Sequence, residues 1–218
     1  MKNINEKEVN IVIVEDNILT RITLKKMLNF TSYINVCADF DNAEDCINYI
    51  KSDGNKVDLV IMDAILPYMS GIEASNILKQ INPAVKILML TTDNDDRQLM
   101  NTLLAQADAY FVRDFSQELL NSTITRIMKG FCEIDKRIQN AFSKFIKSMS
   151  DKDYSFFTSK LTLEESRFLA LVHDELPEDI SSWSVNTPMY SLYPYLYSIL
   201  KKTVNLGLFK QELKYDLF

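Results

Sequence analysis

The chain has 218 residues, of which 47% are hydrophobic and 25% charged, and its formal net charge is −6. This composition allows at least one buried core, but no apolar run approaches the roughly 20 residues of a membrane-spanning helix, so we expect a cytoplasmic protein with no membrane segment. One histidine and four scattered glycines argue against histidine triads, histidine-rich metal sites and glycine-rich nucleotide loops, and therefore against the common nucleotide-dependent enzymes.

Short apolar strands alternate with amphipathic helices over the first 128 residues. The pattern predicts five strands, over Val9–Val14, Ile34–Asp39, Val57–Met62, Val85–Leu90 and Ala109–Val112. It also predicts five helices, over Leu19–Asn29, Ala43–Ser52, Ile72–Gln80, Asp96–Gln106 and Ser116–Met128. This alternation indicates an α/β fold, a doubly wound five-stranded parallel sheet with helices on both faces. The carboxyl ends of its strands should meet at one edge, where such folds bind ligands.

Polar side chains stand at the ends of four predicted strands. Glu15 and Asp16 follow the first strand, Asp63 the third, Thr91 the fourth and Arg113 the fifth. Carboxylates held close together repel one another, so this edge needs a cation, and Mg²⁺ is the natural choice for carboxylate ligands. Asp63 can then attack a phosphoryl donor and form an acyl phosphate, while Arg113 and Thr91 bind the phosphoryl oxygens.

Four segments resemble the receiver domain of two-component response regulators, whose fold is CheY-like and flavodoxin-like. They are Val14–Asn17, Asp58–Gly71, Leu88–Thr92 and Asp108–Asp114. The resemblance covers about residues 9–128 and implies a signalling protein, not an enzyme, that receives its phosphoryl group from a sensor histidine kinase.

The resemblance also implies a role for each site residue. Asp63 would be the phospho-acceptor, and Mg²⁺ would be held by Glu15, Asp16, Asp63 and the main-chain carbonyl of Ile65. Thr91 and Tyr110 would be the switch residues that move on phosphorylation.

One site residue departs from the family pattern. Receivers normally carry lysine where this chain has Arg113, and the wide guanidinium fork differs from a compact ammonium. Arginine pairs well with phosphate oxygens, and we expect the replacement to alter the phosphorylation rate or the coupling to Thr91. A haloacid-dehalogenase-like phosphatase also uses a strand-end aspartate. It would need a second acid two residues later, where this chain has Ile65.

We expect three parts: a receiver domain over residues 1–128, a helical connector over 129–158 and a small all-α output domain over 159–218. In the connector, apolar residues at helical spacing predict a helix within Lys136–Lys147, and Ser148–Asp153 reads as a hinge. In the output domain, Thr162 and Glu165 form a capping-box pattern at the start of a helix. Further helices are expected over Glu178–Ser184 and from Thr187-Pro188 through the run that ends at Lys202.

The output segment weakly resembles the helix-turn-helix domain of NarL/LuxR-class regulators. The resemblance rests on Leu161–Leu171 and on Ser198–Lys202, and it implies DNA contacts by Lys201 and Lys202. The family usually presents lysine and histidine where Tyr193 and Tyr195 align here.

Two further observations oppose DNA binding. Pro194 lies inside the tyrosine-rich segment Tyr190–Tyr197 and is expected to break or kink a helix. Residues 151–218 hold 7 basic and 10 acidic side chains, and this net charge of −3 opposes phosphate contacts. Three readings therefore stay open: transcription control by a diverged helix-turn-helix, a protein-binding output that uses the tyrosine-rich segment, and a receiver that works without phosphorylation. A homodimer is compatible with each.

Overall fold

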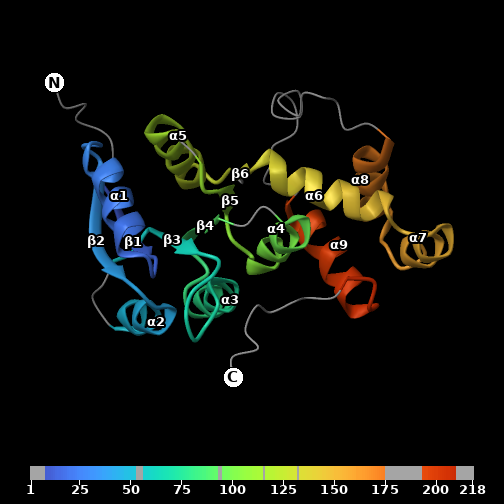
Figure 1. Cartoon of the computed structure of the whole chain (residues 1–218), viewed down its shortest axis with the longest axis horizontal. Helices are drawn as coiled ribbons and strands as arrows, with labels where there is room; N and C mark the ends of the chain where they lie inside the picture. The colour runs from blue at the N-terminus through green and yellow to red at the C-terminus, as the bar shows by residue number, and fades with distance from the viewer. Residues whose placement is uncertain are drawn as a thin grey trace. The chain divides into compact units, whose positions relative to one another are not determined.

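The computed structural model describes residues 8–52, 56–92, 95–114, 116–131, 133–174 and 193–209 (Figure 1). The chain forms two compact units. The first unit comprises Met1–Thr92 and Ala105–Glu133, and the second comprises Asp93–Leu104 and Ile134–Phe218. None of the helices within the described ranges is long and apolar enough to cross a bilayer.

The first unit is built on a sheet with the strand order β2-β1-β3-β4-β5-β6. Its strands are β1 (Val9–Val14), β2 (Ile34–Phe40), β3 (Leu59–Asp63), β4 (Lys86–Thr91), β5 (Ala109–Val112) and the two-residue β6 (Glu133–Ile134). Neighbours among the first five strands pair in parallel. The predicted five-stranded parallel sheet is therefore confirmed, and its order is that of flavodoxin-like folds. The sequence pattern missed β6, which is too short to show a period.

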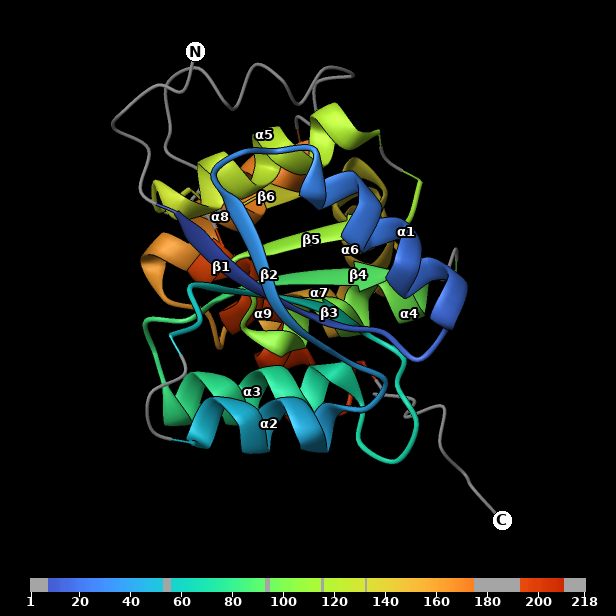
Figure 2. The same ribbon diagram turned by 90° about the vertical axis from the view of Figure 1, so that its left-hand side faces the viewer.

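Helices cover both faces of this sheet. They are α1 (Ile18–Asn29), α2 (Ala43–Lys51), α3 (Gly71–Ile81) and α5 (Gln117–Met128). α1 and α5 lie together on one face, and α2 and α3 lie together on the other (Figure 2). Each begins within two residues of its predicted start, because a polar side chain caps its first backbone N–H groups. These caps are Asn17, Asn42, Ser70 and Ser116.

The core follows from the alternation of side chains along each strand. Alternate residues of β1, β3, β4 and β5 pack against α1 and α5 in one buried cluster. Its strand members are Val9, Ile11, Ile13, Ile34, Leu59, Ile61, Leu88, Leu90, Ala109 and Phe111, and its helix members are Leu24, Leu28, Leu120, Ile124 and Ile127. Most intervening strand residues are also buried, so the strands have two apolar faces, as the sequence pattern predicted; these residues are Val12, Val14, Val60, Met62, Ile87, Met89, Tyr110 and Val112.

The second unit is helical. It contains α4 (Asp96–Thr102), α6 (Lys136–Lys147), α7 (Asp151–Thr158), α8 (Leu163–Asp174) and α9 (Tyr193–Asn205). α4 contacts α6, α6 contacts α8, and α8 contacts α9. α4 is shorter than predicted and continues as a 3₁₀ turn over Leu103–Ala105. The helix cannot run on to Gln106, because that residue has a φ of 51°.

Two expectations about this unit were wrong. The predicted hinge Ser148–Asp153 contains the start of α7, where the Ser150 hydroxyl accepts a hydrogen bond from the backbone N–H of Asp153. Pro194 does not break a helix, because α9 begins at Tyr193 and Pro194 therefore lies in its first turn. A first-turn residue needs no intrahelical N–H donor. The helix expected over Glu178–Ser184 and the start at Thr187-Pro188 lie outside the described residues.

A buried carboxylate joins α8 to α9. The capping box of Thr162 and Glu165 is present, with hydrogen bonds in both directions. Glu165 also accepts hydrogen bonds from the hydroxyl of Ser198 at 2.6 Å and from the ammonium of Lys202 at 2.5 Å. Burial alone would raise the pKa of Glu165, but these donors outweigh burial and hold the pKa below its ordinary value of 4.5. The carboxylate form is thus part of the packing between the two helices.

We predict that Glu165→Gln lowers the free energy of unfolding by about 2 kcal/mol at neutral pH, because the charged hydrogen bond to Lys202 is lost. A lowered folded-state pKa gives stability that is present above pH 4.5 and is lost as pH falls through the folded value. The difference between the two proteins should therefore shrink in acid. Urea unfolding followed by circular dichroism at several pH values measures it. Glu164→Gln, at an exposed neighbour, is the control, and an equal loss in both variants would contradict the assignment.

Candidate functional site

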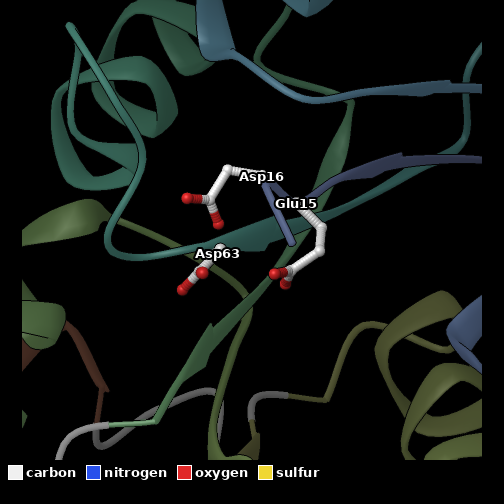
Figure 3. A group of neighbouring side chains, drawn as sticks. All are labelled: Glu15, Asp16 and Asp63. Carbon is white, nitrogen blue, oxygen red and sulfur yellow. The ribbon is translucent and has the colours of Figure 1, made fainter. Parts of the chain in front are cut away.

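Three carboxyl groups converge at the carboxyl ends of β1 and β3. Glu15 and Asp16 directly follow β1, and Asp63 is the last residue of β3. One carboxylate oxygen from each residue lies within 4.8 Å of the others, and Figure 3 shows the three groups directed toward a common space. We call Glu15, Asp16 and Asp63 the acidic pocket.

Backbone pairing sets this convergence. β1 and β3 are parallel neighbours, with Val14 opposite Met62, so the residues after Val14 lie next to Asp63. The backbone N–H of Glu15 donates to the carbonyl of Phe40 at 3.0 Å, which continues the pairing of β1 with β2 by one residue. Glu15 also accepts from the backbone N–H of Asn17, the cap of α1, at 3.1 Å. The sheet edge and the start of α1 thus fix the carboxylate together.

The members of the acidic pocket differ in burial. Glu15 is 1% exposed and Asp63 is 6% exposed, whereas Asp16 is exposed. Burial raises the pKa of Glu15, and Arg113 offsets part of that rise. Burial also raises the pKa of Asp63, to about 7, because the nearby Glu15 adds to the rise and Arg113 cancels only part of it. Negative charge is therefore costly here, and a further cation would be bound favourably.

Arg113 is the cation already in place. Its Nη1 donates to Oε1 of Glu15 at 3.2 Å, its Nη2 donates to Oε2 of the same carboxylate, and Nη2 also lies 2.9 Å from Oδ2 of Asp63. The backbone N–H of Arg113 donates to the carbonyl of Thr91 at 2.6 Å. Arg113, at the end of β5, therefore contacts the acidic pocket as predicted. The sequence predicted that Arg113 binds phosphate and did not indicate its pairing with Glu15.

The two predicted switch residues occupy the neighbouring strands. Thr91 ends β4, is 2% exposed, and follows Leu90, the residue opposite Asp63. Tyr110 is fully buried in β5, and its hydroxyl accepts a hydrogen bond from the backbone N–H of Ala107 at 2.7 Å. Their switching roles stay predictions.

The loop after Asp63 is held close to the sheet. The backbone N–H of Ile65 donates to Oδ1 of Asp63 at 3.2 Å, and the N–H of Gly71 donates to the carbonyl of Ala64 at 3.1 Å. A Cβ atom on Gly71 would lie 1.8 Å from the backbone oxygen of Asp63. Only glycine fits there, so Gly71 is a positioning residue for the loop that carries the predicted acceptor and the carbonyl of Ile65.

The residues present fit Mg²⁺. The acidic pocket offers oxygen ligands of the kind that this hard cation prefers, at spacings that one ion could bridge. The carbonyl of Ile65 stays a predicted fourth ligand.

In the second unit, the two predicted DNA-contacting lysines have different surroundings. Lys202 bonds to Glu165 and to the carbonyl of Lys160. Lys201 is exposed, and its ammonium lies 5.6 Å from the ring centroid of Tyr197. Tyr195 stacks on Phe168, with centroids 5.9 Å apart, so this tyrosine belongs to the contact between α8 and α9.

Residues 11–125 match the sequence model of the response regulator receiver domain. The match covers more than half of the chain and includes every residue of the acidic pocket. The chain belongs to the response regulator receiver family. The predicted recognition is thus confirmed for the receiver.

Parts of the chain are similar in sequence to other response regulators. The chain is 24% identical over 152 residues to the transcriptional regulatory protein DegU of Brevibacillus brevis, covering 70% of this chain and 64% of that protein. The chain is also 27% identical over 122 residues to the response regulator protein VraR of Staphylococcus aureus, covering 56% of this chain and 57% of that protein. The chain thus spans about three fifths of the length of these curated relatives.

The likeness in fold extends beyond the receiver. A structure of two RcsB dimers bound to two parallel DNAs superimposes with a TM-score of 0.58 at 19% identity, covering 90% of this chain and 99% of that one. The chain therefore shares its general fold with RcsB over a length that extends beyond the receiver.

We predict that Gly71→Ala destabilises the receiver by about 3 kcal/mol, because the added methyl group forces the backbone of Asp63 out of place. Gly130→Ala is the matched control. It has open space for the methyl group but a φ of +89°, so it should cost about 1–2 kcal/mol through the backbone alone. Urea unfolding measures both. If the Gly71→Ala protein were as stable as the Gly130→Ala protein, the backbone of Asp63 would be able to move away from residue 71, which would contradict the prediction.

Proposed function

We propose that this protein is a two-component response regulator that is phosphorylated on Asp63 and controls transcription through its second unit. The observation that carries the proposal is the acidic pocket with Arg113 beside it: a buried nucleophilic carboxylate, two further carboxylates and a fixed cation at the ends of three strands. The match of the receiver family to residues 11–125 supports the same conclusion.

The reaction is the transfer of a phosphoryl group to Asp63. An oxygen of its carboxylate attacks the phosphorus atom, a new P–O bond forms, and the bond to the donor breaks with its electron pair leaving on the donor. With a phosphohistidine donor the leaving group is the imidazole, and with acetyl phosphate it is acetate. The 6% exposure of Asp63 leaves little water around the nucleophile.

Glu15, Asp16 and Asp63 would hold Mg²⁺, together with the carbonyl of Ile65. Bound there, the ion supplies charge neutralisation to the phosphoryl oxygens. The same charge offsets the repulsion among the three carboxylates, which burial strengthens for Glu15 and Asp63. The chain's own contribution is to keep these ligands in place through the ends of β1 and β3.

Phosphorylation would act as a switch through the residues at the ends of β4 and β5. A phosphoryl group adds about 1.5 to 2 negative charges at neutral pH. Thr91 and Arg113, which share a backbone hydrogen bond, would bind its oxygens. Tyr110, which is buried in β5, would repack in response. Such a two-state receiver needs only a few kcal/mol of differential stabilisation.

The partners follow from this role. A sensor histidine kinase would supply the phosphoryl group in the cytoplasm. The second unit would bind DNA as a diverged helix-turn-helix, as a counterpart of the RcsB dimers bound to DNA. A homodimer is therefore part of the proposal.

A protein-binding output is the second candidate, and the surroundings of Lys202 favour it. This lysine is engaged by Glu165, and residues 151–218 carry more acidic than basic side chains. A protein partner would then contact the tyrosine-rich segment Tyr190–Tyr197, part of which lies outside the described residues.

We predict that acetyl phosphate with Mg²⁺ adds one phosphoryl group to the wild-type protein and none to Asp63→Asn. Intact mass spectrometry reads the addition directly. Asp114→Asn, which removes an exposed carboxylate one residue from Arg113, is the control and should be modified like the wild type. Absence of the added mass in the wild type would favour a receiver that works without phosphorylation.

We predict that the phosphorylated protein binds a random-sequence DNA duplex with an affinity that falls steeply between about 50 and 200 mM salt. Fluorescence anisotropy measures the binding. Lys201→Gln should reduce the slope of log affinity against log salt by about one, because one phosphate contact is lost. Lys147→Gln, at an exposed position of α6, is the control. No binding even at low salt would favour the protein-binding output.

A further inference from the structure

Arg113 occupies the same carboxylate that the proposed metal site needs. Oε1 of Glu15 accepts from Nη1 of Arg113 at 3.2 Å and from the backbone N–H of Asn17 at 3.1 Å. Oε2 accepts from Nη2 of Arg113. A carboxylate oxygen has two lone pairs, so both lone pairs of Oε1 are used, and the one that remains on Oε2 lies beside the guanidinium. Since Glu15 is 1% exposed, its side chain cannot turn to offer a different oxygen to an ion without leaving these donors.

We infer that Arg113 and the divalent cation compete for Glu15, so that the cation enters the acidic pocket by displacing the guanidinium from this carboxylate. The inference rests on the proposed function and adds a positioning role for Arg113 to it. In the structure, Arg113 bridges Glu15 and Asp63 and neutralises part of their charge. With the cation bound, the guanidinium is released from Glu15 and becomes available to an anion at Asp63.

Two features of Arg113 suit it to this exchange. Its planar fork pairs in bidentate fashion with both oxygens of Glu15 and also reaches Asp63, whereas the ammonium of lysine is a compact point charge without this fork. Its Nε is buried and has no hydrogen-bond partner within the described part of the chain, so the guanidinium is held through its two Nη atoms alone. Loss of the contacts to Glu15 therefore leaves it anchored only beside Asp63.

Electrostatics also argues for exchange over joint occupancy. The carboxylate oxygens of the acidic pocket lie within 4.8 Å of one another. If a divalent ion were bound among these oxygens while the guanidinium still contacted Glu15 and Asp63, two cations would lie at short range. Their repulsion would be poorly screened, because the site is largely buried. Movement of Arg113 away from Glu15 relieves this repulsion.

The test is a double-mutant cycle on cation affinity in the full-length protein. Mn²⁺ serves as the probe for the Mg²⁺ site, and the electron paramagnetic resonance signal of the free ion gives its affinity. Arg113→Lys, which keeps the charge but not the fork, should bind Mn²⁺ about tenfold more tightly than the wild type. In the Glu15→Gln background the same substitution should give no gain, because the contested carboxylate is gone.

Thermal unfolding gives a second readout that does not depend on phosphorylation. In EDTA, Arg113→Lys should melt at a lower temperature than the wild type, and Mn²⁺ should raise its midpoint more than it raises that of the wild type. Equal Mn²⁺ affinities of the wild type and Arg113→Lys would overturn the inference, as would a gain that persists without Glu15. If these failures occur while acetyl phosphate still modifies Asp63, only the competition is disproved. If no protein is modified on Asp63, the proposed function itself fails.

Discussion

Repulsion among three carboxylates at one sheet edge is the constraint on which the first unit depends. The parallel pairing of β1 with β3 gives these groups no freedom to separate, and burial removes most of the water that would screen Glu15 and Asp63. Burial is the main cause of the raised pKa values of both groups, and repulsion from the neighbouring carboxylates adds to the rise. A fold that places such charges together is stable only if positive charge is supplied, and in this chain a residue from a third strand, Arg113, supplies part of it.

The backbone around the site leaves little room for adjustment. The N–H of Arg113 bonds to Thr91, the N–H of Ile65 bonds to Asp63, and the α-carbon of Gly71 approaches the carbonyl of Asp63 too closely for any side chain. These contacts join the ends of three strands to the loop before α3. A change in the charge or size of the group on Asp63 must therefore be accommodated by side chains, and Arg113, Thr91 and Tyr110 are the ones on the adjoining strand ends.

The sequence was sufficient to predict the sheet, its helices and the meeting of Glu15, Asp16 and Asp63, because strand periodicity and parallel topology determine which residues end at which edge. It could not show that Arg113 contacts Glu15, since that contact depends on side-chain reach across two intervening strands. In the second unit, Pro194 and Ser150 were misread because a residue that breaks a helix interior is tolerated or even favourable in a first turn or at a cap. The burial of Glu165 against Lys202 was equally invisible, because the two residues lie far apart in the chain.

The position of α4 has a consequence for how the protein can be divided. Although the helix lies between β4 and β5 in the sequence, it clusters with the second unit and contacts α6, to which Lys144 and Asp96 add an exposed ion pair at 3.0 Å. A fragment cut after residue 128 would carry α4 without α6 and would leave an apolar helix surface open to water. A cut at this position would therefore separate α4 from the helices with which it clusters, although it lies between two strands of the sheet in the sequence.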